Sequence, residues 1–174
     1  MKRIRTARLL PKDATYAEMN SPVGTLTLIT SGAGLHAIFW DVDCDSLDYK
    51  KMILTLTKSQ NDPIILETKK QLTEYFQGKR KVFDLPLVPQ GTDFQIKAWQ
   101  QLLKISYGST ISYGDQAEKM GNKNKARAVG MANRANPISI IIPCHRVIGC
   151  TGDLVGFAGG LDKKTYLLEL EKNC

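Results

Sequence analysis

The sequence predicts a mixed α/β (α+β) protein built from a small N-terminal β-sheet unit with a helix and a mostly helical C-terminal unit. Residues 23–40 alternate apolar and polar side chains around a glycine-containing turn, whereas residues 94–135 repeat apolar side chains at helical spacing. The length of 174 residues, with 43% hydrophobic residues, suits one ordinary domain or two small ones. We place the units at residues 1–90, including a linker, and 91–174.

A β-hairpin is expected in the N-terminal unit. In VGTLTLI, Leu26 and Leu28 share one face of a strand, and Thr25 and Thr27 share the other. The segment SGAG is typical of a turn, and the alternation resumes after it in LHAIFW. These two runs therefore predict two paired strands.

One helix is expected after the hairpin. Asp62 can cap its start, Pro63 suits the first helical position, and Gly78 is expected to end it. Leu72 and Phe76 supply apolar positions inside it. The stretch KRKVFDLPLVPQG, with two prolines, indicates an extended linker to the second unit.

A longer helix is expected to open the C-terminal unit. Thr92 and Gln95 form a T-x-x-Q capping box before FQIKAWQQLLKI. Gly108 is expected to end this helix. Its predicted apolar stripe consists of Trp99, Leu102, Leu103 and Ile105.

Two shorter helices are expected next, at about 113–120 and 124–135, separated by Gly121 and Asn122. Two short helices joined by a glycine-containing turn are typical of a helix-turn-helix, although tandem helices of other kinds are also common. The pattern is therefore compatible with DNA binding without requiring it.

Positive charge is concentrated in the C-terminal unit. The formal net charge of the chain is +7, and no Asp or Glu occurs from Lys119 to Gly152. A run of this kind is often only a solvated face, but this one surrounds Cys144 and favours a polyanionic partner. The basic residues within it are Lys119, Lys123, Lys125, Arg127, Arg134 and Arg146.

The cysteine and histidine content argues against a metal site. Four scattered cysteines without a CxxC pair, and only two histidines, make a four-ligand zinc site improbable and favour a reducing, cytoplasmic compartment. Residues 1–16 are basic but lack the apolar segment of a secretory signal, and they resemble a transit peptide only faintly. Residues 19–40 have the alternation of a hairpin and do not predict a membrane span.

The stretch SIIIPCHRVIG sets a thiol beside an imidazole and a guanidinium. Asn136-Pro137 ends the preceding helix, and SIII predicts a short strand leading to Cys144. Such a cysteine is either inert packing or a nucleophile, and these residues alone leave both open. Adjacent side chains on a strand point to opposite faces, so His145 serves Cys144 only if the chain turns after Pro143 or a water relays the proton.

The order of motifs resembles one family. The segments FQIKAW, GSTISYGDQA, KARAVGMANRANP, SIIIPCHRVIG and GFAGGLDKKTYLLELE occupy residues 94–171. With them the chain resembles the O6-alkylguanine-DNA alkyltransferase (methylated-DNA–protein-cysteine methyltransferase) family of bacterial type. The N-terminal half resembles the family only in length and in its hairpin and helix. The resemblance implies a winged-helix-like C-terminal unit with a helix-turn-helix, and neither cofactor nor metal.

The resemblance also implies catalytic roles. Cys144 would accept the alkyl group from O6 of guanine by in-line displacement. His145 would deprotonate Cys144 through a water, and Glu171 would orient His145. Tyr113 would help rotate the phosphate out and protonate the departing guanine, and Asn136 would brace the turn between the recognition helix and the active-site strand.

Further roles implied by the resemblance concern DNA and the guanine pocket. Arg127 would insert into the base stack in place of the extruded base, and Arg146 receives no role beyond a structural one. Phe157 stands where the family often has Tyr, and Leu170 where it often has His. The expected DNA contacts are Arg127, Tyr113, Lys123, Lys125 and Arg134, and the expected pocket residues are Val147, Phe157, Ala158 and Gly159.

The implied function is repair of O6-methylguanine, and of O4-methylthymine, in double-stranded DNA by one irreversible transfer per molecule. A monomer would bind the minor groove, with no membrane partner. One alternative is a cysteine hydrolase using Cys144, His145 and Glu171, disfavoured because such enzymes separate the Cys and His in sequence. A second alternative is a non-catalytic lesion sensor, although family relatives of that kind carry Trp in place of Cys144.

Overall fold

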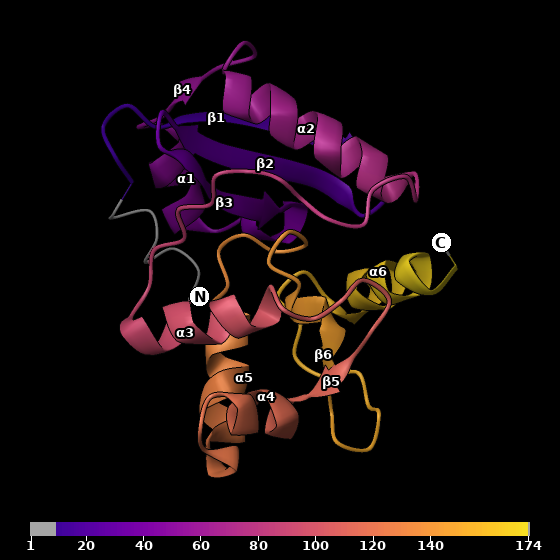
Figure 1. Cartoon of the computed structure of the whole chain (residues 1–174). Helices are drawn as coiled ribbons and strands as arrows, with labels where there is room; N and C mark the ends of the chain where they lie inside the picture. Colours follow the sequence, from indigo (N-terminus) through magenta and orange to yellow (C-terminus); the bar gives the residue numbers. More distant parts are fainter. Residues whose placement is uncertain (1–9, 174) are drawn as a thin grey trace. The chain divides into compact units, whose positions relative to one another are not determined.

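The chain divides into two compact units, Met1–Gln90 and Gly91–Cys174 (Figure 1). The computed structural model describes residues 10–173, so the basic residues 1–9 and Cys174 lie outside the described part. The predicted α/β class is confirmed, with a sheet in the first unit and mostly helices in the second.

A four-stranded sheet in the order β3-β2-β1-β4 forms the N-terminal unit. Strands β1 (Thr15–Ser21), β2 (Gly24–Ser31) and β3 (Gly34–Trp40) pair antiparallel in sequence order, and β4 (Thr57–Lys58) pairs parallel with β1. The expected hairpin is therefore confirmed as β2 and β3, and β1 extends it into a meander.

Two helices pack on this sheet. Helix α2 (Pro63–Phe76) lies along the sheet in Figure 1 and contacts β1, β2 and β3. Its start follows the prediction, since the Asp62 carboxylate accepts the backbone N–H groups of Ile64 and Ile65. Helix α1 (Leu47–Ile53) was not predicted; Ser46 caps it by accepting from Tyr49 N, and it follows the 3-10 turn η2 (Asp41–Asp43).

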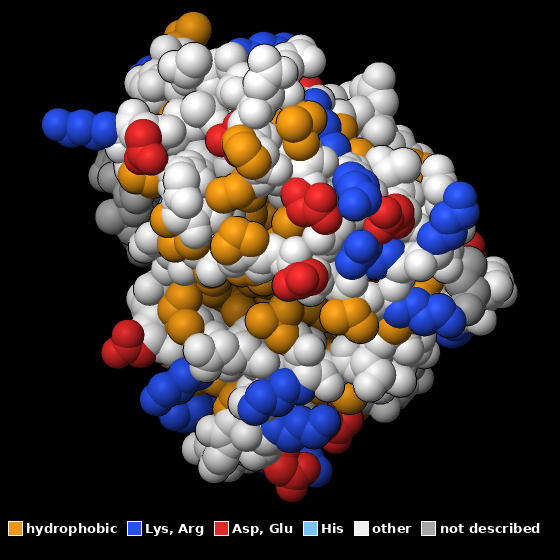
Figure 2. All heavy atoms as spheres, turned by 45° about the horizontal axis from the view of Figure 1, so that its top comes forward, with side chains coloured by type: hydrophobic (Ala, Val, Ile, Leu, Met, Phe, Trp, Pro, Cys, Tyr) orange, Lys and Arg blue, Asp and Glu red, His pale blue; other side chains and the backbone are white. Residues whose placement is uncertain are grey.

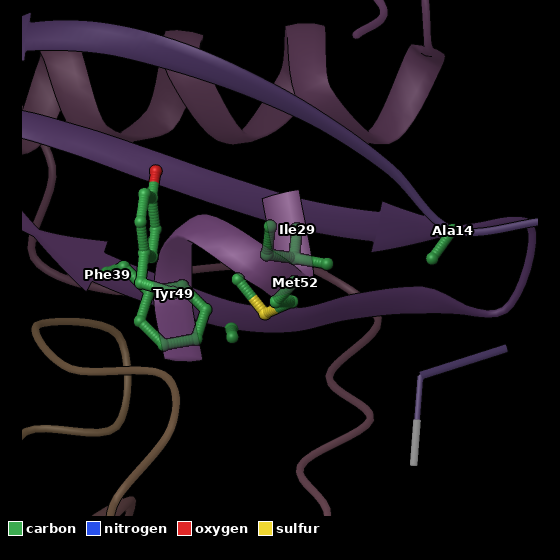
Figure 3. Close-up of a cluster of buried hydrophobic side chains, with 6 residues drawn as sticks. Ala14, Ile29, Phe39, Tyr49 and Met52 are labelled. Atoms are coloured by element: carbon green, nitrogen blue, oxygen red, sulfur yellow. The ribbon is translucent and has the colours of Figure 1, made fainter. Parts of the chain in front are cut away.

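The side of the sheet that carries Ile29 and Phe39 packs on α1 (Figure 3). Tyr49 and Met52 of α1 pack there, and the Tyr49 and Phe39 rings meet edge to face at 5.6 Å between centroids. Thr27 lies on this side and is fully buried, whereas the sequence placed it on the polar face of the strand. Its hydroxyl is satisfied by the Tyr49 hydroxyl at 2.8 Å, so β2 is covered on both faces.

The predicted linker is extended, and it pairs with the edge strand of the sheet. Leu35 N donates to Pro86 O at 2.8 Å, and Val88 N donates to Leu35 O at 2.9 Å. This pairing covers part of the open edge of β3, which would otherwise expose unpaired backbone groups.

Helix α3 (Asp93–Leu102) opens the C-terminal unit with the predicted capping box, in which Thr92 and Gln95 exchange hydrogen bonds. The helix ends at Leu102, before Gly108, so part of the predicted apolar stripe is wrong. Leu103 is the C-cap and is 50% exposed, because the chain leaves the helical register there.

The two short helices are present as α4 (Tyr113–Lys119) and α5 (Ala126–Arg134). Residues 123–125 form a separate 3-10 turn, η3 (Lys123–Lys125), because the Asn122 side chain accepts from Asn124 N. Gln116 and Asn133 exchange buried amide hydrogen bonds of 2.7 and 3.2 Å, and Gln116 also donates to Ala98 O. This network fixes the angle between α4 and α5 and ties both to α3.

The predicted strand before Cys144 is wrong. Residues 138–142 form a tight loop in which Ile142 N donates to Ile138 O at 2.9 Å. Ile140 adopts φ 77, a conformation that β-branched residues rarely take. Local hydrogen bonding therefore overrides the strand propensity of the isoleucines.

The remaining elements complete the C-terminal unit. Strands β5 (Ile111–Ser112) and β6 (Val147–Ile148) form a short parallel pair, the 3-10 turn η4 (Cys144–Arg146) precedes β6, and α6 (Leu161–Asn173) closes the chain. Among the helices of residues 10–173, none has the length and apolar character to cross a membrane.

The glycine at the start of β3 gives a test of the fold. Gly34 has φ +146, and a Cβ there would collide with the carbonyl oxygen of Pro86. We expect Gly34→Ala to lower the free energy of unfolding by about 2 kcal/mol or more, measured by urea denaturation.

Gly32→Ala is the matched control two residues away. A Cβ on Gly32 meets only Asp13 Oδ2, at 3.8 Å. We expect its effect to stay within about 0.5 kcal/mol. Equal losses from the two substitutions would contradict the proposed role of the β3–linker contact.

Candidate active site

Cys144 lies in the single-turn helix η4, which is closed by a hydrogen bond from Arg146 N to Pro143 O at 3.1 Å. Cys144 N donates to Ile142 O at 2.8 Å. With three residues per turn, consecutive side chains of a 3-10 helix point about 120° apart. Of the two routes that the sequence left open, a turn after Pro143 is observed, and within it His145 and Arg146 both reach Glu171.

Asn136 joins this turn to the end of α5. Its side-chain amide donates to Ile142 O at 2.7 Å, and its Oδ1 accepts from Ile138 N at 3.1 Å. The side chain is fully buried and holds both ends of the loop 138–142. Any movement of α5 is therefore passed to the segment directly before Cys144.

Glu171 is placed by α6 in the centre of the site. Its Oε1 lies 2.8 Å from His145 Nε2. Arg146 approaches the same carboxylate as a fork, with Nε 2.9 Å from Oε2 and Nη2 2.9 Å from Oε1. Gly108 N donates to Oε2 at 3.1 Å, and Arg146 Nη1 donates to Ile105 O at 2.6 Å. One buried carboxylate on α6 thus collects donors from two other segments of the unit, η4 and the stretch after α3.

These donors keep Glu171 ionised. Burial alone raises the pKa of a carboxyl group, but hydrogen bonds from His145 and Arg146, together with the positive charge of Arg146, outweigh it here and lower the pKa of Glu171 to about 2. The carboxylate is therefore charged throughout the physiological range. It accepts hydrogen bonds and donates none.

The charge on Glu171 fixes the state of His145. Burial, the largest influence, lowers the pKa of His145, and Glu171 offsets part of that shift. A neutral imidazole facing an ionised carboxylate must carry its proton on Nε2, so Nδ1 keeps a free lone pair. His145 Nδ1 is buried and has no hydrogen-bond partner among residues 10–173. It can accept a proton.

Lys164 is a second buried cation beside the site. It is fully buried, and its ammonium donates to Val147 O at 2.7 Å and to Val155 O at 2.9 Å. Burial lowers the pKa of Lys164, and the nearby Cys144 side chain acts in the opposite direction. The ammonium links β6 to the loop 149–160 and adds positive charge near the sulfur.

Tyr113 shares an acceptor with Lys164. Its hydroxyl donates to Val155 O at 3.2 Å. Burial, followed by the charge of Cys144, raises the pKa of Tyr113 to about 12, so the phenol keeps its proton. A Cβ on Gly130 would lie 3.6 Å from the Tyr113 ring, which places the ring against α5.

The basic side chains predicted to bind DNA are exposed. Those of η3 and α5 project from the surface, away from the buried Val129, Ala132 and Asn133. On the face drawn in Figure 2, Lys and Arg side chains are interspersed with Asp and Glu, so that face as a whole is not uniformly basic. The exposed basic residues of this segment are Lys123, Lys125, Arg127 and Arg134.

Comparison with known proteins follows the same division of the chain. Residues 93–173 match the 6-O-methylguanine DNA methyltransferase DNA binding domain, and residues 14–89 match the ribonuclease-like domain described for the same enzymes. A methylated-DNA–protein-cysteine methyltransferase of Methanosarcina acetivorans is 43% identical over 159 residues, which cover 91% of this chain and 99% of that protein.

The chain belongs to the methylated-DNA–protein-cysteine methyltransferase family. The Bacillus subtilis protein named as the constitutive enzyme is 40% identical over 90% of this chain and 94% of its own. The solved O6-methylguanine methyltransferase of Mycobacterium tuberculosis has a TM-score of 0.82 at 42% identity, over 92% of this chain and 93% of that one. A structure of Mycobacterium tuberculosis OGT in complex with DNA has a TM-score of 0.81 at 42% identity, over 91% and 93%.

Three of the residues that the family resemblance assigns to the guanine pocket lie in the loop 149–160. Phe157 and Ala158 are half-buried and Gly159 is buried, in a loop held by the Val155 carbonyl and by Gly160 N donating to Phe157 O at 3.3 Å. Their place in a guanine pocket stays a prediction. Val147, in contrast, is fully buried directly after η4.

The sequence did not predict the buried position of Lys164 or the ion pair between Arg146 and Glu171. Lys164, Leu167 and Glu171 are the buried residues of α6 and follow the i, i+3, i+7 spacing of one helix face. That spacing was available in the sequence and would have pointed Lys164 inward. The Arg146–Glu171 pair joins residues 25 apart, and no local pattern reveals such a pairing.

A metal site was not expected in this family member. Within residues 10–173, no group of three or more His, Cys, Asp or Glu side chains is arranged to hold an ion. Cys44, Cys144 and Cys150 form no disulfide among these residues.

The lowered pKa of Glu171 predicts how stability depends on pH. In the folded state the pKa is about 2, against an ordinary value of 4.5, so the unfolded chain binds this proton more readily. The stabilising effect of the carboxylate is complete above pH 4.5 and is lost as the pH falls toward 2. Glu171→Gln should therefore be less stable than the parent at pH 7, by an amount that shrinks steadily below pH 4.5, measured by urea denaturation at each pH.

Glu169→Gln is the control, since it changes an exposed carboxyl group on the same helix. We expect it to stay within about 0.5 kcal/mol of the parent at pH 7. A stability difference between parent and Glu171→Gln that does not change with pH would contradict the assignment.

Proposed function

We propose that the protein repairs alkylated DNA by moving the alkyl group from O6 of guanine, and from O4 of thymine, onto Cys144 in one irreversible step. The observation that carries this proposal is the proton acceptor beside the thiol. His145 Nδ1 is buried with its lone pair uncommitted among the described residues, one position along the same turn from Cys144. Family membership supplies the substrate class.

The step balances without a cofactor. The Cys144 proton passes to His145 Nδ1, through a bridging water, and Glu171 stabilises the imidazolium that forms. The sulfur then attacks the alkyl carbon, so a C–S bond forms while the C–O6 bond breaks. The departing guanine takes a proton from the Tyr113 hydroxyl, which lies at the edge of the site. The imidazolium proton of His145 then returns to the Tyr113 phenolate through water, so both side chains end in their starting state. The product is a thioether on Cys144. His145 cannot remove the alkyl group from it, so each molecule acts once.

Most of the rate must come from positioning. Full ionisation gains at most roughly 30-fold over the few per cent of thiolate that an ordinary thiol has at neutral pH. The hydrogen bonds of Asn136, η4 and Lys164 fix the backbone on both sides of Cys144. A sulfur held in line with the alkyl carbon gains far more than ionisation can supply.

Burial of Cys144 requires the nucleotide to leave the duplex. Cys144 is 6% exposed, so a base that stays stacked in the duplex cannot reach its sulfur. Extrusion costs a few kcal/mol, and Arg127 offsets part of that cost by filling the gap in the stack. The acid-free segment around α5 supplies phosphate contacts through Lys123, Lys125 and Arg134.

We place α5 in the minor groove of the duplex and propose that the protein acts as a monomer. Small residues along the helix, Ala126, Ala128 and Gly130, permit a close approach to a narrow groove. Base pairs are poorly distinguished there, which suits a protein that must inspect any sequence. A reaction that depends on a reduced thiol suits the cytoplasm, where thiols are kept reduced.

Mass spectrometry of the protein after incubation with a duplex oligonucleotide containing one O6-methylguanine tests this function. The parent should gain one methyl group, on the peptide that carries Cys144, and at most one equivalent of guanine should be restored. Cys144→Ala should gain nothing while still binding the duplex, because its basic surface is unchanged.

Cys150→Ala is the matched control, since Cys150 is an exposed thiol six residues further on. It should react like the parent. A methyl group found on Cys150, or product formed far beyond one equivalent as a hydrolase would give, would refute the proposal.

Arg127→Ala tests the insertion role. We expect repair of duplex DNA to slow by about tenfold or more, because the extruded base then leaves an unfilled gap, while repair of a single strand changes little. Rates are compared by single-turnover assays on the two substrates.

Arg134→Ala controls for the loss of charge from the same exposed face of α5. It should slow repair of duplex and single-stranded substrates by more similar factors. If Arg127→Ala also slows both substrates equally, the insertion role is wrong.

A further inference from the structure

Helix α5 exposes one large apolar side chain. Met131 is 51% exposed, whereas Val129, Ala132 and Asn133 of the same helix are buried. Single exposed apolar residues are common and need no explanation by themselves. The position of Met131 relative to its charged neighbours is what distinguishes it.

Met131 stands between Arg127 and Arg134 on one helix face. At about 100° per residue, these three side chains fall within an arc of about 60°. The buried residues of α5 are centred on the opposite side of the helix. Along the helix axis, Met131 therefore lies in the middle of the exposed face of α5, with an arginine one turn away on each side.

The partner that fits this surface is DNA. No acidic residue occurs from Lys119 to Gly152, so α5 itself and the sequence that flanks it complement a polyanion. Ala128 and Gly130 are small, which leaves Met131 as the only large uncharged side chain exposed along α5. Proteins that bind the minor groove commonly place apolar side chains, Met among them, against or between base steps.

Resting on the proposed function, we propose that Met131 is an apolar DNA-contacting residue that packs into the minor groove beside the inserted Arg127. Its thioether removes deoxyribose and base edges from water, and this contribution does not depend on counterion release. The side chain is flexible and its sulfur accepts hydrogen bonds only weakly, so it adapts to any base step and selects none. Met131 thus strengthens binding without adding sequence preference.

Two substitutions separate this contact from charge and from folding. Met131→Gln keeps length and helix propensity but makes the tip polar, and Met131→Leu keeps the apolar character. The control is Leu103→Gln, an equally drastic change at a residue 50% exposed at the end of α3. Arg134→Gln provides the contrast of a lost phosphate contact.

Affinity for an undamaged duplex is measured by fluorescence anisotropy between 50 and 200 mM salt. We expect Met131→Gln to weaken binding by about five- to tenfold at every salt concentration, with the slope of log K against log salt unchanged. Met131→Leu and Leu103→Gln should bind within about twofold of the parent, and Arg134→Gln should make the slope shallower by about 1.

The same samples are assayed for methyl transfer to Cys144, which separates the two proposals. Weaker binding by Met131→Gln together with no methyl transfer by the parent would support the contact and refute the repair function. Methyl transfer by the parent, with Met131→Gln binding like the parent, would overturn the contact. A parent that does not bind the duplex, or a Leu103→Gln loss as large as that of Met131→Gln, would also overturn it.

Discussion

The buried carboxylate of Glu171 is the interaction on which the rest of the C-terminal unit depends. It receives the Arg146 fork, His145 Nε2 and Gly108 N, so it joins η4, α6 and the segment after α3. A buried carboxylate left without such donors would cost several kcal/mol. Its full set of partners makes the charge tolerable, and the same partners set the chemistry of the site.

The arrangement explains why Cys, His and Arg follow one another in the sequence. A 3-10 turn points three consecutive side chains in three directions, so the thiol can face the substrate while the other two share one anion. His145 Nε2 contacts Glu171, and Arg146 helps to keep the pKa of Glu171 low, so the carboxylate does not take the proton from the imidazole. A lysine in place of Arg146 would carry the charge but could not form the two parallel hydrogen bonds.

Local sequence signals predicted the fold well where structure depends on nearby residues. The Asp62 cap, the Thr92–Gln95 capping box and the β2–β3 hairpin are all present because each depends on residues a few positions apart. The prediction that Leu103 is buried was wrong because the helix ends before it. The strand predicted at residues 139–142 was wrong because hydrogen bonding by the Asn136 side chain overrides their β propensity. Within the site, the thiol and imidazole could be recognised from their motif, whereas the Arg146 fork and the two carbonyls held by Lys164 depend on tertiary packing.

Ile140 shows what the Asn136 side chain contributes beyond its two hydrogen bonds. A β-branched residue at φ 77 carries about 1–3 kcal/mol of backbone strain, and its sequence neighbours favour an extended chain. The loop is therefore strained, and the hydrogen bonds of the buried Asn136 amide hold it in this conformation. Cys144 lies four residues after Ile140. Loss of the Asn136 hydrogen bonds would therefore relax the loop and also shift the Cys144 sulfur. Residues 138–144 thus both hold backbone strain and set the position of the Cys144 sulfur.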